Sequence, residues 1–71
     1  MDGEKKLILL IDDDINLLTT LKDFLSYEGY RVDTADCGEE GLKRLKEITP
    51  DLIILDMSMP GMGGIGFLNE I

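Results

Sequence analysis

The sequence predicts an α/β fold in which a parallel sheet carries helices on its faces. Apolar runs without polar alternation occupy residues 6–11 and 52–55, as is typical of strands covered on both faces. Segments 15–28 and 39–48 repeat apolar residues at helical spacing and alternate with the strands along the chain. The order β-α-β-α-β, with a further helix opening at residues 66–71, implies right-handed crossovers between parallel strands.

The helix expected at residues 15–28 has a start signal and a stop signal. Asp14 precedes it and suits the N-cap position, where a short side-chain oxygen accepts a backbone N–H. Gly29 follows it and suits the left-handed conformation that ends many helices. One stripe of this helix is apolar and should face the sheet: Leu17, Leu18, Leu21, Phe24 and Leu25.

The second strand and the second helix have weaker signals. Residues 31–35 are partly polar, with Val32 and Thr34, which suits a strand at the edge of the sheet. The helix expected at residues 39–48 includes Gly41, and Pro50 ends it before the third strand. A glycine inside a helix costs up to about 1 kcal/mol relative to alanine. The apolar residues of this helix recur at a spacing of three: Leu42, Leu45 and Ile48.

Composition limits the class of protein. The chain has 71 residues, of which 44% are hydrophobic, so it has room for one small globular domain. Its net charge of −8 argues against direct binding to nucleic acid or to an anionic membrane surface. No apolar run approaches the roughly 20 residues of a membrane span. Cys37 is the only cysteine, which excludes an internal disulfide, and we expect a reducing, cytoplasmic location.

Acidic residues follow two of the predicted strands. Asp12, Asp13 and Asp14 end the first apolar run, and Asp56 ends the third. Because the carboxyl ends of parallel strands meet at one edge of a sheet, these side chains should converge there. Two unit charges about 4 Å apart repel by roughly 4 kcal/mol at an effective dielectric constant near 20. A bound cation would offset that repulsion.

Among metals, Mg²⁺ fits this edge of the sheet best. It takes oxygen ligands, usually one or two carboxylates with waters and a phosphate. The chain lacks the alternating acidic loop of a calcium site, and it has no histidine and a single cysteine to bind zinc. Taken alone, each acidic segment is more typical of a solvated turn. Their coincidence at two strand ends is what favours a metal site.

The motifs and their order resemble the receiver domain of two-component response regulators. The resemblance implies a flavodoxin-like receiver fold with strand order 2-1-3, in which residues 1–71 form a partial receiver domain truncated after the third strand. The matching segments are Ile8-Leu9-Leu10-Ile11-Asp12-Asp13-Asp14, Gly29-Tyr30-Arg31-Val32, Gly38-Glu39-Glu40-Gly41-Leu42, Pro50-Asp51-Leu52-Ile53-Ile54-Leu55-Asp56 and Met59-Pro60-Gly61-Met62.

The resemblance also implies a role for each acidic residue. Asp56 corresponds to the phosphoacceptor, which takes a phosphoryl group from a histidine of a sensor kinase or a phosphotransfer protein. Asp12, Asp13 and Asp56 correspond to ligands of Mg²⁺, and the backbone carbonyl of Ser58 corresponds to a further ligand. Such a domain is not an enzyme acting on other molecules. At most it catalyses its own phosphorylation and dephosphorylation.

The chain departs from the family pattern in two respects. A receiver domain has five strand–helix units, so the switch serine or threonine of the fourth strand and the lysine and aromatic residue of the fifth have no counterpart here. Gly63 and Gly66 stand where the family has acidic residues, which should weaken the third helix. If the domain is truncated here, the third strand is an open apolar edge, and we expect a homo-oligomer that pairs third strands or exchanges elements. The alternative is that these residues are one part of a full receiver domain.

Two other functions are compatible with parts of this sequence. A non-phosphorylated module would use the fold only for oligomeric interaction or as a structural element. A phosphohydrolase with an aspartate nucleophile would need Asp-x-Asp-x-Thr or Val after the first strand, but Asn16 occupies the last of these places. Phosphoacceptor function is therefore the main prediction, and the non-phosphorylated module is the alternative.

Overall fold

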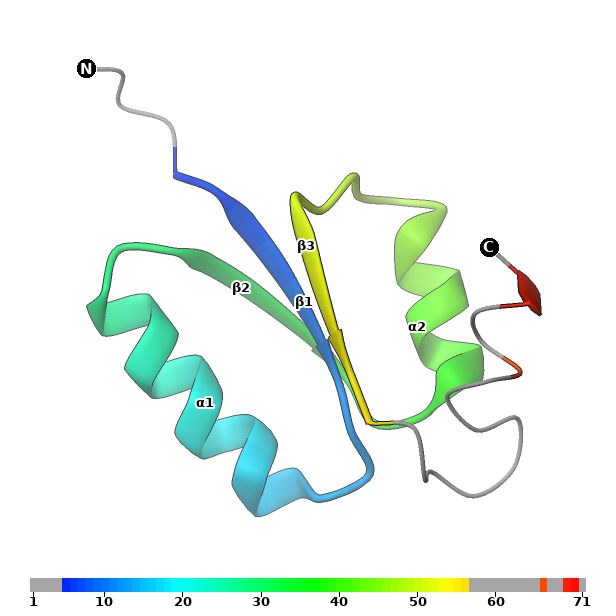
Figure 1. Ribbon diagram of the computed structural model, residues 1–71, viewed down its shortest axis with the longest axis horizontal. Coiled ribbons are helices and arrows are strands. Elements are labelled where there is room, and N and C mark those ends of the chain that lie inside the picture. The colour runs from blue at the N-terminus through cyan, green and yellow to red at the C-terminus, as the bar shows by residue number, and fades with distance from the viewer. Residues whose placement is uncertain (1–4, 57–65, 67–68, 71) are drawn as a thin grey trace.

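A computed structural model describes residues 5–56, 66 and 69–70 of the chain. Three strands and two helices alternate in it: β1 (Leu7–Ile11), α1 (Ile15–Tyr27), β2 (Arg31–Ala35), α2 (Gly38–Leu45) and β3 (Leu52–Leu55). Figure 1 shows α1 on one face of the sheet and α2 on the other. This arrangement confirms the predicted α/β class.

The three strands form one parallel sheet in the order β2-β1-β3. Ile8 of β1 is the Cα partner of Val32 on one side and of Leu52 on the other. The observed order is the predicted 2-1-3, and β2 and β3 have the predicted bounds. Because β1 is central, its residues are covered by both neighbouring strands and both helices, and Leu9, Leu10 and Ile11 are almost fully buried.

The core is divided by the sheet into two clusters. On the α1 side, Ile8 and Leu10 pack with Leu18, and on the α2 side Leu9 and Ile11 pack with Ala35. Successive residues of β1 point to opposite faces, so a strand that is apolar throughout serves both clusters. Partly buried residues complete them: Leu21, Leu25 and Val32 on the first side, and Leu42, Leu45, Ile48, Ile53 and Leu55 on the second.

Helix α1 begins at the predicted residue and ends one residue before the predicted end, with Glu28 as its C-cap. The Asp14 carboxylate accepts the Leu17 N–H at 3.1 Å, which confirms the N-cap. Gly29 has a φ of 102°, in the left-handed region that a helix end of this kind requires. The apolar stripe was predicted too wide, because Leu17 is 41% and Phe24 58% exposed. These two side chains flank the face that packs on the sheet.

Helix α2 begins one residue earlier and ends three residues earlier than the predicted range 39–48. Cys37 is its N-cap, and the thiol sulfur accepts the Glu40 N–H at 3.4 Å. The chain still turns beyond Leu45, since the Ile48 N–H donates to the Arg44 carbonyl at 2.9 Å. The three predicted apolar residues of this segment therefore still reach the core.

The segment after β3 is described only in part. Gly66, Asn69 and Glu70 have helical backbone, in line with a third helix near the predicted position. Gly63 lies outside the described residues. In the part of the chain that the structure describes, no helix has the length and apolar character needed to cross a membrane.

Candidate functional site

The carboxyl ends of β1 and β3 hold three aspartates at one edge of the sheet. The Asp12 N–H donates to the Ala35 carbonyl at 3.1 Å, and the Asp56 N–H donates to the Ile11 carbonyl at 2.9 Å. Each of these aspartates is therefore the residue after a strand, still fixed by a backbone hydrogen bond to the neighbouring strand. Fixed backbones limit where the side chains can point, which is what a preorganised site requires.

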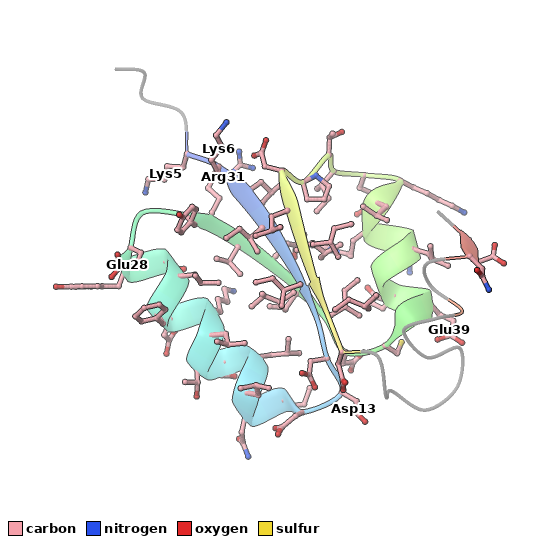
Figure 2. The ribbon with its side chains drawn as sticks, viewed as in Figure 1. Lys5, Lys6, Asp13, Glu28, Arg31 and Glu39 are labelled. Atoms are coloured by element: carbon pink, nitrogen blue, oxygen red, sulfur yellow. The ribbon has the colours of Figure 1, made fainter. Side chains whose placement is uncertain are left out.

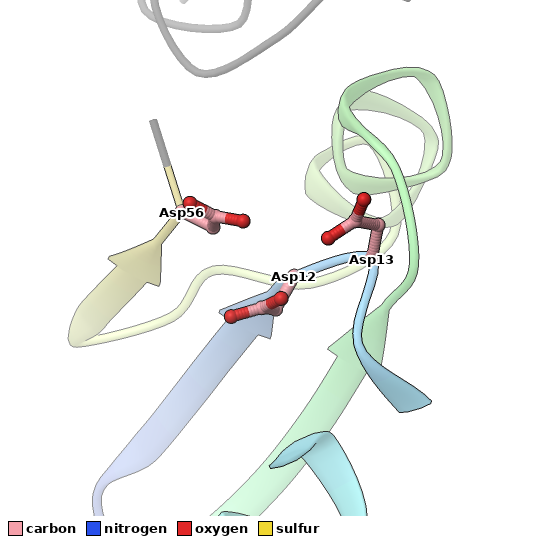
Figure 3. Close-up of side chains that lie close together, drawn as sticks. All are labelled: Asp12, Asp13 and Asp56. Carbon is pink, nitrogen blue, oxygen red and sulfur yellow. The ribbon is translucent and has the colours of Figure 1, made fainter. Parts of the chain in front are cut away.

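Asp12, Asp13 and Asp56 converge, and we call them the aspartate triad. One carboxylate oxygen from each lies within 4.8 Å of the others. Figure 3 shows the three side chains close together at the ends of β1 and β3. Asp12 and Asp56 are half-buried and Asp13 is exposed, so the triad is accessible to solvent at Asp13. The sequence predicted that these three residues would meet at this edge, and the structure brings them together.

Asp14, the fourth acidic residue of the region, is turned away from the triad by its role in the helix cap. Its carboxylate accepts from Leu17, and its own N–H donates to Asp12 Oδ1 at 2.9 Å. The second contact restrains the side chain of Asp12. Asp14 thus acts as a positioning residue for Asp12 as well as a cap.

Electrostatics make this edge attractive to a cation. Like charges at about 4.8 Å repel by roughly 3.5 kcal/mol per pair at an effective dielectric constant near 20, before screening by salt. Figure 2 shows that Lys5, Lys6 and Arg31 lie at the opposite ends of the strands from Asp13. Within residues 5–56, no ion pair joins Asp12 or Asp13 to a lysine or arginine.

The triad fits a magnesium ion by its chemistry. Carboxylate oxygens are the hard ligands that Mg²⁺ prefers, and an open side leaves room for the waters or phosphate oxygens it retains. Histidine and thiolate ligands, which zinc would favour, are absent from the triad. The backbone carbonyl of Ser58, the other predicted ligand, lies outside the described residues and stays a prediction.

One ion pair was missed from the sequence. Arg44 of α2 donates to both oxygens of Asp33 on β2, the shortest distance being 2.7 Å. The hydrogen bond and charge of Asp33 raise the pKa of Arg44 above its ordinary value. The sequence contained one signal for this ion pair, an aspartate within the predicted second strand and an arginine in the helix that follows it. The pair lies on the outer strand rather than in the triad.

Comparison with known proteins gives the same family from sequence and from structure. The family described as response regulator receiver domain matches residues 8–71. The transcriptional regulatory protein AfsQ1 of Streptomyces coelicolor is 51% identical over 64 residues, which make up 90% of this chain and 28% of AfsQ1. The chain therefore spans less than a third of this relative.

Solved structures of response regulators have the same fold as this chain. Chemotaxis protein CheY4 of Vibrio cholerae superimposes with a TM-score of 0.91 at 33% identity, over 94% of this chain and 56% of that one. Response regulator TrrA of Thermotoga maritima, solved with Mg²⁺ and BeF, has a TM-score of 0.86 at 47% identity over 93% of this chain and 57% of its own. TrrA was also solved in complex with histidine kinase ThkA, with a TM-score of 0.83, 46% identity, and coverage of 92% of this chain and 56% of that one.

The evidence for the family is thus threefold: the order of the motifs, the β2-β1-β3 sheet with helices on both faces, and the family match over residues 8–71. This chain belongs to the response regulator receiver domain family of two-component systems.

Proposed function

We propose that Asp56 accepts a phosphoryl group, with Mg²⁺ held by the aspartate triad. The observation that supports this most strongly is the meeting of three carboxylates within 4.8 Å at the carboxyl ends of β1 and β3. A second support is the likeness to TrrA, which was solved with Mg²⁺ and BeF at 47% identity. Residues 1–71 form a partial receiver domain in this proposal.

In the proposed reaction, one carboxylate oxygen of Asp56 attacks the phosphorus of a phosphohistidine. The bond between phosphorus and oxygen forms as the bond to the imidazole nitrogen breaks, and the electron pair stays on that nitrogen. The product is an acyl phosphate on Asp56. Asp56 is half-buried at a strand end, so its carboxylate is restrained while one side stays open to a donor.

Asp12 and Asp13 would share the ion with Asp56, and the backbone carbonyl of Ser58 would be a further ligand. When bound, Mg²⁺ would neutralise charge on the phosphoryl oxygens during the transfer. The Asp14 N–H donates to Asp12 Oδ1 at 2.9 Å, which restrains the Asp12 carboxylate for this role. The domain would promote only its own phosphorylation and dephosphorylation.

The proposed partner is a histidine kinase or a phosphotransfer protein. Its support is the solved complex of TrrA with histidine kinase ThkA, at 46% identity to this chain. The proposal places the protein in the cytoplasm, where such a kinase would present its histidine. The net charge of −8 argues against direct contact with nucleic acid or anionic lipid.

Intact-mass spectrometry after incubation with acetyl phosphate and Mg²⁺ tests the proposal. We expect a gain of one phosphoryl group that disappears in Asp56→Asn and when Mg²⁺ is chelated. Asp36→Asn is the matched control, because Asp36 is an exposed aspartate after β2, outside the triad. A folded protein that gains nothing, or an Asp56→Asn variant that gains as much as the wild type, contradicts the proposal.

The alternative is a non-phosphorylated module that serves in oligomeric interaction. It is favoured by one observation, the exposure of Leu52 and Ile54 on a strand of the sheet. If Asp56→Asn leaves both association and partner binding unchanged and no phosphoryl group is gained, this alternative replaces the phosphoacceptor.

A further inference from the structure

Strand β2 lies at one side of the described sheet, so some of its backbone groups point away from β1 (Figure 1). The Arg31 N–H donates to the Lys6 carbonyl at 2.9 Å, which turns Arg31 and every second residue after it toward β1. By alternation, the N–H and C=O groups of Val32 and Thr34 point outward. Outward groups of this kind are a template on which another strand can pair.

The Asp33 side chain occupies the middle of this edge. Asp33 Oδ1 accepts the Thr34 N–H at 2.9 Å, so this outward amide already has an acceptor within the chain. A strand that approached from outside would set a carbonyl oxygen against the carboxylate, and the two acceptors would repel each other. The Val32 N–H, in contrast, has no side-chain acceptor among residues 5–56. The two outward amides of β2 therefore differ, and only that of Thr34 is capped.

Arg44 holds the Asp33 carboxylate in place from α2. Its Nη2 donates to the two carboxylate oxygens at 2.8 and 2.7 Å, and its Nε donates to one of them at 3.0 Å. The side chains are partly shielded from water, with 34% of Arg44 and 23% of Asp33 exposed. Charged hydrogen bonds to both oxygens fix the orientation of a carboxylate more firmly than a single exposed contact does.

Displacing this carboxylate from the edge would carry a second cost. Arg44 has one other acidic neighbour among the described residues, Glu47, whose contact of 3.5 Å is longer and whose side chain is 59% exposed. A strand that pushed Asp33 away from Thr34 would therefore also disturb the main ion pair of Arg44. Removing one partner from a shielded ion pair destabilises the protein, because the other charge loses its partner. Charged side chains on an edge strand are one means by which proteins prevent pairing between sheets.

We propose that Asp33 and Arg44 together close the β2 edge, so that neither a second copy nor another segment of the protein extends the sheet there. All the contacts involved lie within residues 5–56, so this closure acts whatever follows residue 71. A partner of this domain can still bind beside β2 through its side chains. Strand addition, in which the partner joins the sheet through backbone hydrogen bonds, is blocked at this edge.

Replacement of Asp33 by valine should convert β2 into an association surface. Asp33→Val frees the Thr34 N–H, removes the charge and introduces a β-branched residue that favours strands. Sedimentation equilibrium of the full chain should show self-association at least about tenfold tighter than that of the wild type, because each copy gains backbone hydrogen bonds to the other. If Asp33→Val keeps the circular dichroism of the wild type and associates no more tightly, the proposal is wrong.

Two further variants separate the cap from the change in charge. Asp36→Val is the matched control, because Asp36 is an exposed aspartate directly after β2, and the variant has the same net charge as Asp33→Val. It should sediment like the wild type. In Asp33→Asn the side-chain oxygen can still accept the Thr34 N–H, so this variant should associate less tightly than Asp33→Val. Association of either variant to the same degree as Asp33→Val contradicts the proposal.

Hydrogen exchange of the wild type tests the cap without any substitution. At low protein concentration, and after correction for intrinsic rates, the Thr34 amide should exchange at least about tenfold more slowly than the Val32 amide. In Asp33→Val both amides should become protected as the concentration rises, which would locate the new contact at β2. Equal exchange of the two amides in the wild type overturns the proposal, and so does association of Asp33→Val without protection at β2. These experiments use neither Mg²⁺ nor a phosphodonor, so their results are independent of the proposed phosphoacceptor function.

Discussion

The two outer edges of the sheet differ in how their polar groups are satisfied. At β2, Asp33 Oδ1 accepts the Thr34 N–H at 2.9 Å, and the same carboxylate is held by Arg44 from α2. Thr34 is one of the β2 residues whose N–H points away from β1, so the chain caps its own edge here. At β3, the outward N–H groups of Ile53 and Leu55 receive no such cap within residues 5–56.

The carboxylates of the two regions differ in the same way. Asp33 has an arginine supplied by the fold, whereas Asp12 and Asp13 have no ion pair with a basic side chain in the described part of the chain. The β2 side therefore satisfies its hydrogen bonds and its charge internally. The β3 side carries the exposed side chains of Leu52 and Ile54 and the aspartate triad, in which Asp12 and Asp13 have no basic partner within residues 5–56.

The largest expected effect on stability distinguishes the central strand β1 from the outer strand β3. Leu9→Ala should lower the free energy of unfolding by about 2–5 kcal/mol, because the side chain is fully buried on the central strand. Leu52→Ala should cost below about 1 kcal/mol in dilute protein, since the side chain is already half exposed. Urea denaturation measures both. If both variants lose the same free energy of unfolding, the side chain of Leu52 is buried as deeply as that of Leu9, which contradicts the difference between β1 and β3.

A smaller effect, the stabilisation by Mg²⁺, distinguishes the aspartate triad from Asp33. Mg²⁺ at a hundred times its dissociation constant should stabilise the wild type by about 2.7 kcal/mol. Asp13→Asn should remove that gain while stabilising the metal-free protein, because one repulsive charge is lost from the triad. Asp33→Asn, the matched control on the other strand, should keep the gain. Thermal unfolding with and without Mg²⁺ measures this stabilisation. If Mg²⁺ still stabilises Asp13→Asn, the triad is not the metal site.

The smallest effect concerns the β2 cap. Asp33→Ala removes the acceptor of the Thr34 N–H and the partner of Arg44, so the Thr34 amide should exchange with solvent faster while the amides of β1 keep their protection. Hydrogen exchange followed by NMR measures this residue by residue. In the wild-type monomer the Thr34 amide should exchange more slowly than that of Ile53. The opposite order would remove the distinction between the two edges.

Much of the fold follows from local patterns in the sequence. The apolar runs at β1 and β3, the Asp14 cap and Gly29 each have a cause within a few residues, and all were predicted correctly. The end of α2 was predicted too late. Residues 46–48 continue to turn after the helix ends, and the sequence pattern does not distinguish such a turn from helix. Helix ends are the least determined part of such a pattern.

The sequence by itself determined the strand order, through family resemblance, and the convergence of Asp12, Asp13 and Asp56, because parallel strands end at a common edge. Only the tertiary structure decided which polar groups pair across elements. The Asp33–Arg44 pair joins residues 11 positions apart on different elements, and its formation depends on where α2 crosses β2. The exposure of Leu17, Leu52 and Ile54 was decided in the same way, since an apolar residue is buried only if another element lies over it.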